Sequence, residues 1–260
     1  MGHTGLQQQV IVYDEDNPLK PIPRCTNDEW LDACNALRNT YPWIEFPTHE
    51  DVNGKPNSYR VVDALNRWIR HDEIITTDMG AALVCGFYGL RLRPPQRLLT
   101  SGGLGEMGCG LPAAIGASFA RGKGEVLCLN TDGGMMLNLQ ELSTVLHHNL
   151  PIKMLVFAND VYAMIRGTQD NLGYAHRGVD GKDISLPNYR RLAQSWGIIG
   201  ADVYTWAQFY DILPQFFSVK APAIMVVHID PAQKFHPKLE PIMVDGKPTS
   251  PRFNQLSPLR

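Results

Sequence analysis

The chain has 260 residues, of which 44% are hydrophobic and 19% charged, a composition that suits a buried α/β core. Its 24 Lys and Arg residues are balanced by 26 Asp and Glu residues, so its charge gives no reason to expect nucleic acid as a partner. No stretch approaches the roughly 20 apolar residues of a membrane span, and the N-terminus has no apolar signal-peptide region, so we expect a cytoplasmic protein with no membrane partner.

Residues 1–55 are rich in proline and polar residues and contain one predicted helix, Asn27–Asn39. Acidic residues in the first turns of this helix favour it through the helix dipole. We interpret residues 1–55 as a linker and a docking helix. The five cysteines are odd in number and scattered, which indicates reduced thiols; they are Cys25, Cys34, Cys85, Cys109 and Cys128.

Residues 56–230 alternate between helical and strand patterns. The predicted elements are helix Tyr59–Arg70, strand Glu73–Thr77, helix Gly110–Ala120, strand Val126–Asn130, helix Gly134–His148, strand Ile152–Ala158, helices Leu186–Trp196 and Thr205–Val219, and strand Ala223–Ile229. This alternation predicts an α/β fold, a mainly parallel sheet with helices on both faces. Residues 231–260 contain six prolines and no clear periodicity, and we interpret them as a tail over the domain edge.

Two polar residues end neighbouring strands of this predicted sheet. Asp132 follows the run Val126–Leu129, and Asn159 follows the strand that ends at Ala158. Parallel strands present their C-terminal ends at one edge, where open α/β sheets bind ligands. Carboxylate, amide and carbonyl oxygens there can hold Mg²⁺, and Gly133 and Gly134 leave helix N–H groups bare for an anion. Alternatively, Asp132 caps a helix and Asn159 occupies a turn.

This pattern of Asp-Gly, about 27 residues and then Asn resembles the thiamine-diphosphate signature. Residues 101–117 are similar to the cofactor-pyrimidine segment of acetolactate-synthase-like enzymes, and residues 135–142 and 149–153 match the same family. The resemblance extends from about residue 72 to residue 230. It implies the thiamine-diphosphate-binding fold, with Mg²⁺ held by Asp132, Asn159 and the main-chain carbonyl of Val161.

The resemblance also suggests which residues contact thiamine diphosphate. Main-chain N–H groups after Asp132 and Asn159 would bind the diphosphate, the main chain around Gly105 and Met107 would meet the pyrimidine, and Val84 would prop the cofactor unless it only packs in the core. The full set is Gly80, Ala81, Ala82, Val84, Gly105, Met107, Asp132, Gly133, Gly134, Asn159, Val161, Tyr162, Ala163 and Met164.

The chain departs from the family pattern at several positions. Thr131 replaces the first glycine of Gly-Asp-Gly, and Ala81 and Ala82 stand where acetolactate synthases have polar residues that help to hold the diphosphate. Thr168 stands where acetolactate synthases have a pocket tryptophan. Arg166 is a candidate for a substrate carboxylate, with a plain surface arginine as the alternative.

The family's activating glutamate comes from a different domain, usually in the partner subunit, and the sequence has no match to that segment. Glu106 lies in the cofactor motif but on the wrong domain, so no catalytic residue is assigned to this chain. We therefore expect the thiamine-diphosphate- and Mg²⁺-binding half of an acetolactate-synthase-like enzyme acting on a 2-oxo acid. Its partner would be a pyrimidine-binding domain or subunit, in a dimer or tetramer of the complete enzyme.

Two alternatives stay open. The chain could be the small subunit of a two-chain 2-oxo-acid decarboxylase, of the sulfo- or phosphonopyruvate type, or a non-catalytic thiamine-diphosphate-binding homologue. Binding of FAD is also open, since in this family FAD lies largely on a middle domain that has no match in the sequence.

Overall fold

The computed structural model describes residues 28–45, 48–237 and 242–252. The chain divides into two units, Met1–Trp43 and Ile44–Arg260. The first contains helix α1 (Asp28–Thr40), which lies where the sequence predicts it and has no buried side chain. Asn27 and Cys25 lie outside the described residues.

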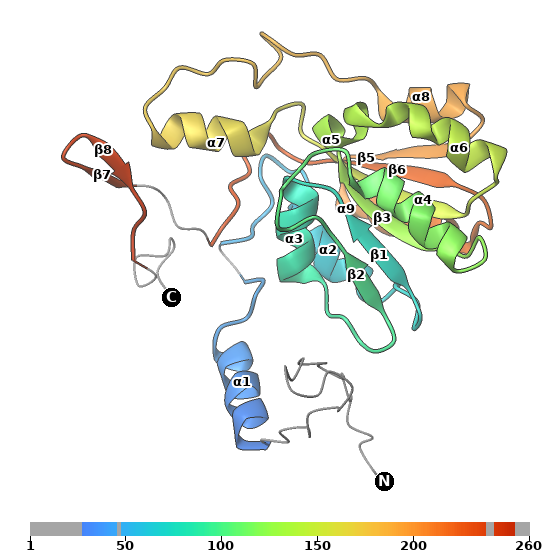
Figure 1. Ribbon diagram of the computed structural model, residues 1–260, viewed down its shortest axis with the longest axis horizontal. Coiled ribbons are helices and arrows are strands. Elements are labelled where there is room, and N and C mark those ends of the chain that lie inside the picture. Colours follow the sequence, from blue (N-terminus) through green and yellow to red (C-terminus); the bar gives the residue numbers. More distant parts are fainter. Residues whose placement is uncertain (1–27, 46–47, 238–241, 253–260) are drawn as a thin grey trace, which may run out of the picture. The chain divides into compact units, whose positions relative to one another are not determined.

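The second unit is built on a six-stranded parallel sheet with the strand order β2-β1-β3-β4-β6-β5 (Figure 1). The strands are β1 (Ile74–Thr77), β2 (Arg97–Leu99), β3 (Val126–Thr131), β4 (Ile152–Ala158), β5 (Ile199–Val203) and β6 (Ala223–His228). Every residue of β4 is buried, as is typical of a central parallel strand whose two faces are covered by helices.

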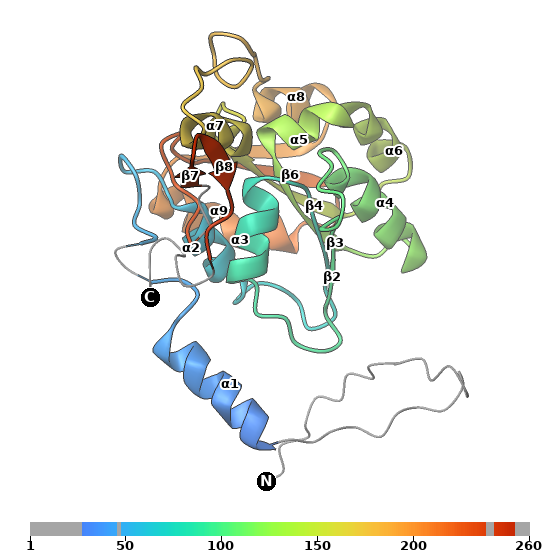
Figure 2. The same ribbon diagram turned by 60° about the vertical axis from the view of Figure 1, so that its left-hand side comes forward.

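Helices cover both faces of the sheet. They are α2 (Ser58–Leu65), α3 (Ala81–Gly89), α4 (Gly110–Ala120), α5 (Asp132–Leu137), the 3-10 turn η1 (Leu139–Glu141), α6 (Leu142–His147), α7 (Ala163–Asn171), α8 (Tyr189–Ser195) and α9 (Trp206–Ser218). Helices α2, α3 and α9 pack in one hydrophobic cluster and α4, α5, α6 and α8 in another, with alternate side chains of the central strands pointing into each. Figure 2 shows α3 and α4 on opposite sides of the sheet. The predicted α/β class is confirmed.

Some elements differ from the prediction. The helix predicted over residues 134–148 is interrupted at Asn138, whose backbone leaves the helical region (φ −134°, ψ 32°), so α5, η1 and α6 follow one another. Strands β2 and β5 and helices α3 and α7 were not predicted. Both strands are sheet edges and mostly half-buried or exposed, so neither carries a continuous apolar run.

Polar contacts join the chain around the start of α2, residues 49–58, to the chain after β6. Asn53 donates to Asp230 at 3.1 Å, Ser58 N–H donates to Gln233 Oε1 at 2.9 Å, and Gln233 Nε2 donates to Ser58 Oγ at 2.6 Å. His49 Nε2 lies 3.1 Å from the carbonyl oxygen of residue 236. Further along, β7 (Ile242–Val244) and β8 (Lys247–Thr249) form an antiparallel hairpin.

Within the described ranges, no helix has the length and apolar character needed to cross a membrane. Four of the cysteines, Cys34, Cys85, Cys109 and Cys128, are free thiols there.

Candidate functional site

Three polar residues follow the carboxyl ends of adjacent strands. Asp78 follows β1, Asp132 follows β3 and Asn159 follows β4, and the parallel register of these strands brings their ends to one edge of the sheet. All three are buried, with exposed fractions of 1%, 2% and 6%. Buried polar groups at the carboxyl edge of an open α/β sheet mark the usual ligand position of such folds.

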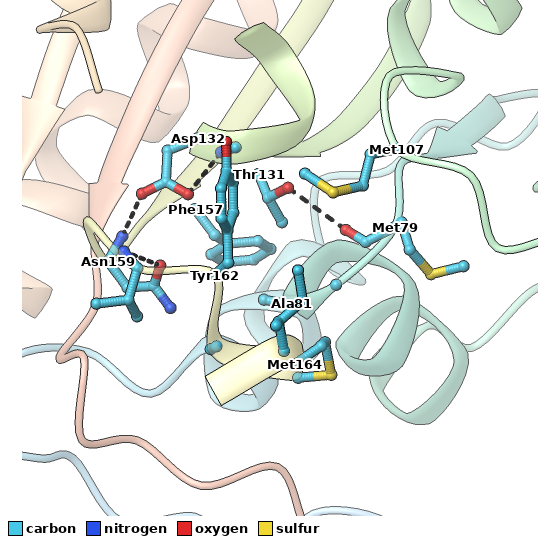
Figure 3. A pocket seen from close by; sticks show the side chains of 14 residues that line it. Met79, Ala81, Met107, Thr131, Asp132, Phe157, Asn159, Tyr162 and Met164 are labelled. Atoms are coloured by element: carbon cyan, nitrogen blue, oxygen red, sulfur yellow. Dashed lines mark hydrogen bonds between the residues drawn. The ribbon is translucent and has the colours of Figure 1, made fainter. Parts of the chain in front are cut away.

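The carboxylate of Asp132 joins the ends of β3 and β4. Its Oδ2 accepts from Asn159 N–H and its Oδ1 from Gly133 N–H, both at 2.8 Å (Figure 3). The same Oδ2 also accepts from Asp160 N–H at 2.8 Å. Asn159 Oδ1 accepts from Val161 N–H at 3.3 Å. Asp160 has a φ of +58°, an unusual conformation for a residue with a side chain, and the bond from its N–H to Asp132 holds the turn there. Asp132 and Asn159 are therefore brought together, as the sequence predicts.

Burial raises the pKa of Asp132 to about 6. The N–H donors from Asp160, Asn159 and Gly133 oppose this shift because they stabilise the charged form, while the neighbouring Asp160 carboxylate adds to it. The carboxylate is thus ionised above about pH 6 even without a bound cation.

Thr131, and not Asp132, caps helix α5. Thr131 has extended backbone angles (φ −119°, ψ 158°), and its hydroxyl accepts from Gly134 N–H at 3.2 Å. Any type of residue can adopt this extended backbone conformation. Threonine therefore replaces the family's first glycine without strain. The capping role of Thr131 leaves the Asp132 carboxylate directed toward the end of β4.

Gly133 and Gly134 are required by close packing on both sides of α5. A Cβ at Gly133 would stand 2.2 Å from the ring of Tyr162, and one at Gly134 would stand 2.5 Å from Oδ2 of Asp78. Any larger residue at either position would displace a neighbour.

A mainly apolar cavity opens beside these residues, and Figure 3 shows the side chains around it. Among the residues that the structure describes, Asp132 is the only carboxylate in the lining, which comprises Met79, Gly80, Ala81, Met107, Thr131, Asp132, Gly133, Phe157, Asn159, Val161, Tyr162, Ala163, Met164 and Ile165. The cavity thus brings together ten of the fourteen predicted cofactor contacts.

The other four predicted contacts lie nearby. Gly134 packs behind α5 against Asp78. Gly105 has a φ of +70°, and a Cβ there would stand 2.7 Å from Met79 Cε. Ala82 is fully buried in the core on α3, and Val84 is partly buried against the same hydrophobic cluster.

The two candidate substrate residues lie on α7 outside the cavity lining. Arg166 donates from its guanidinium to the main-chain carbonyl of Pro231. Thr168 is exposed and donates its hydroxyl to Met164 O at 3.1 Å. Glu106 is exposed on the glycine-rich loop and accepts from the Ser101 hydroxyl.

Several main-chain N–H groups near the cavity already have partners within the chain. Gly133 donates to Asp132, Gly134 donates to Thr131, and Tyr162 donates to the carbonyl of Val179 at 2.8 Å. Binding of an anion by these groups would therefore replace existing hydrogen bonds.

Asp78, Asn138 and Tyr189 support this site, although no sequence pattern predicts a role for them. Asp78 accepts from Gly108 N–H, Asn138 donates to Gly108 O, and Tyr189 donates its hydroxyl to the Asp132 carbonyl. A signal existed for Asp78 alone, an acidic residue directly after a strand. The contacts of Asn138 and Tyr189 join distant parts of the chain, which no local pattern reveals.

The chain matches the family described as "Thiamine pyrophosphate enzyme, C-terminal TPP binding domain" over residues 78–228, more than half of its length. It is 32% identical to a probable acetolactate synthase large subunit of Methanococcus aeolicus, over 78% of this chain and 34% of that protein. It is 32% identical to the acetolactate synthase isozyme 1 large subunit of Escherichia coli, over 70% of this chain and 32% of that protein. It is 30% identical to a mitochondrial acetolactate synthase catalytic subunit of Saccharomyces cerevisiae, over 81% of this chain and 31% of that protein. The chain thus spans about a third of the length of these relatives.

Proposed function

Because the chain belongs to the family of thiamine pyrophosphate enzymes with this C-terminal TPP-binding domain, we propose that it forms the diphosphate- and Mg²⁺-binding half of an acetolactate-synthase-like enzyme. The substrate class would be a 2-oxo acid, and the reaction a decarboxylation followed by carbon–carbon ligation. The observation that carries this proposal is the pairing of Asp132 with the turn of Asn159 at the carboxyl edge of the sheet.

The chemistry of the donor groups supports a magnesium site. Asp132 supplies a carboxylate, Asn159 an amide oxygen and Val161 a main-chain carbonyl, and Mg²⁺ prefers such hard oxygen ligands. Among the described residues, no three His, Cys, Asp or Glu side chains converge as metal ligands, so a softer transition-metal centre has no support there. Gly133 lines the cavity at the start of α5, so its main chain is the part of this helix that a diphosphate would approach, by replacing the hydrogen bond to Asp132.

The apolar lining of the cavity supports a role in orienting the cofactor rings and excluding water. Met107, Tyr162 and Met164 would contact the bound cofactor, while Ala81 offers space in place of a polar side chain. When bound, thiamine diphosphate supplies a nucleophilic carbon and an electron sink for decarboxylation. The chain's own residues would bind the diphosphate, orient the rings and keep the reacting atoms out of bulk water.

The activating carboxylate would come from another domain or subunit. Of the described residues that line the cavity, Asp132 alone has a carboxylate, and three hydrogen bonds occupy it; Glu106 is exposed and does not belong to that lining. This supports a shared active site in a dimer or tetramer of the complete enzyme, which we expect in the cytoplasm.

Reconstitution tests this proposal. The 260-residue chain, saturated with thiamine diphosphate and Mg²⁺, should turn over no 2-oxo acid, because a missing general acid–base group alone costs about 10²–10⁴-fold. Activity should appear on mixing with a pyrimidine-binding domain of an acetolactate synthase, saturate near equal stoichiometry, and vanish when the glutamate of that domain is replaced. Rapid turnover by this chain alone would refute the shared site.

A second candidate is a non-catalytic thiamine-diphosphate-binding homologue. It is favoured by Ala81 and Ala82 and by the hydrogen bonds that already occupy the N–H groups of Gly133, Gly134 and Tyr162. Product analysis of the reconstituted protein with pyruvate separates the possibilities. Acetolactate supports the synthase, and an aldehyde or no product supports a two-chain decarboxylase. Cofactor binding without product from pyruvate, sulfopyruvate or phosphonopyruvate supports the non-catalytic homologue.

A further inference from the structure

Gly108 is held from both sides by polar side chains, the buried Asp78 and the half-buried Asn138. Its N–H donates to the two carboxylate oxygens of Asp78, at 2.9 and 3.1 Å, and its carbonyl accepts from Asn138 Nδ2 at 2.7 Å. We infer that Asp78 and Asn138 are positioning residues that clamp Gly108 and so fix the turn carrying Gly105 and Met107 at the pyrimidine end of the cofactor site. This inference rests on the proposed function for the identity of the ligand.

Asp78 is held in place by hydrogen bonds other than those to Gly108. It follows β1 directly, is 1% exposed, and its own N–H donates to Leu129 O at 2.8 Å. Its Oδ1 also accepts from Met79 N–H at 2.6 Å. Burial raises the pKa of this carboxyl, opposed by the N–H donors of Met79, Gly108 and Gly110. A carboxylate with a fixed backbone and several N–H donors is a rigid support for a loop.

Asn138 holds the same glycine from the other side, at the point where α5 ends. The helix predicted for this region stops at Asn138, whose backbone leaves the helical conformation while its side chain reaches Gly108. Gln140 donates to Asn138 Oδ1 at 3.3 Å, so the amide is oriented with its NH₂ group toward the loop. The interruption of the helix thus coincides with the contact to the loop.

The clamp ties the loop to the same helix that begins at the metal site. A Cβ at Gly108, whose φ is +88°, would stand 2.8 Å from Leu137 Cβ, and a Cβ at Gly134 would stand 2.5 Å from Asp78 Oδ2. Gly108 therefore packs directly on α5, and Asp78 lies against the first turn of α5. Met107, which lines the cavity, is held one residue before the clamped glycine.

The expected consequence is selective. Loosening the clamp should free the turn of Gly105 and Met107, while the three hydrogen bonds of Asp132 at the metal side stay in place. Binding of the whole cofactor should then weaken more than binding of its diphosphate end alone.

The experiment compares the full chain with Asn138→Ala and Asp78→Asn, using two probes in the presence of Mg²⁺, thiamine diphosphate and inorganic pyrophosphate. We expect each variant to bind thiamine diphosphate about three- to tenfold more weakly, the effect of one lost hydrogen bond. Binding of pyrophosphate should stay within about twofold of the parent. Hydrogen exchange should become faster at Gly108 and its neighbours in both variants.

Asn66→Ala is the matched control. Asn66 Nδ2 also donates to a glycine carbonyl at 2.7 Å, that of Gly89, but neither residue lines the site cavity. This control should leave both affinities and exchange at Gly108 unchanged.

Unchanged exchange at Gly108 in Asn138→Ala would overturn the clamp, and so would equal weakening of both probes, which would indicate general loosening. The Asn138→Ala variant decides the matter if Asp78→Asn does not fold. A parent chain that binds neither probe would refute the proposed function, whereas exchange at Gly108 would still decide whether the clamp exists.

Discussion

Changing Asp132 to asparagine should remove the charge of the proposed metal ligand while nearly preserving its shape. The carboxylate accepts three main-chain N–H groups, each at 2.8 Å. Hydrogen bonds to charged groups contribute about 1.5–3 kcal/mol each, and an unsatisfied buried donor costs about 1–3 kcal/mol. Alanine would leave all three donors without a partner and destabilise the fold by several kcal/mol, so loss of binding in that variant would be hard to separate from loss of folding.

Asparagine separates the two effects. Its oxygen can keep the bonds from Asn159 and Asp160, and its NH₂ group then faces Gly133 N–H, so we expect a loss of about 1–3 kcal/mol in the free energy of unfolding. Mg²⁺ should increase the affinity for thiamine diphosphate at least about 100-fold less in this variant than in the parent. The reason is that mutating residues that only support metal ligands already lowers metal affinity about 10–100-fold.

Urea unfolding and cofactor titrations with and without Mg²⁺, at pH 8 where Asp132 is ionised, measure both quantities. Asp202→Asn is the matched control, because this half-buried carboxylate accepts from Arg190 at 2.6 Å and from His228 at 2.9 Å but does not line the cavity. It should lose stability without changing the effect of Mg²⁺. If Asp132→Asn retained the full Mg²⁺ effect, the ligand assignment would be refuted.

Four further substitutions have defined outcomes. Burial raises the pKa of Glu73 from 4.5 to about 7, so its contribution to stability is complete below pH 4.5 and is lost as the pH rises through 7. The test compares the free energy of unfolding at pH 5 and at pH 8. Between these pH values the Glu73→Gln variant should lose about 2–3 kcal/mol less stability than the parent, and equal losses in the two proteins would contradict this. Gly133→Ala should abolish cofactor binding because its Cβ would stand 2.2 Å from Tyr162, whereas Gly116→Ala, with nothing within 4 Å, should stabilise α4 by about 0.5–1 kcal/mol in thermal unfolding. Tyr189→Phe should cost about 1 kcal/mol in urea unfolding by removing its hydroxyl bond to α5, and an unchanged midpoint would argue against that bond.

The central strands could be predicted because their residues are buried on both faces and therefore form continuous apolar runs. Strands β3, β4 and β6 lie within one residue of the predicted bounds. Strands β2 and β5 lie at the edges of the sheet, and most of their residues are half-buried or exposed. They therefore carry no such apolar run. Their pairing is decided by the rest of the sheet, which local sequence does not contain.

The candidate site was predictable where a polar residue ends a buried strand. That pattern predicts Asp132 and Asn159, and Asp78 follows strand β1 in the same way. The hydrogen bond of Asp78 is made to Gly108, thirty positions later, and that of Tyr189 to the carbonyl of Asp132. Such contacts arise only when the chain folds, so the residues that support the site were the ones that sequence patterns did not supply.

The contacts that join residues 49–58 to residues 230–237 bear on how this protein can be divided for expression. A fragment cut to the family match, residues 78–228, would lack helix α2, whose Tyr59, Val61, Val62 and Leu65 are fully buried in one of the two hydrophobic clusters. It would also lack Gln233, the partner of Ser58. Such a fragment should aggregate or be degraded. A recombinant protein that begins before His49 and ends after His236 keeps helix α2 and both segments that contact each other, residues 49–58 and 230–236.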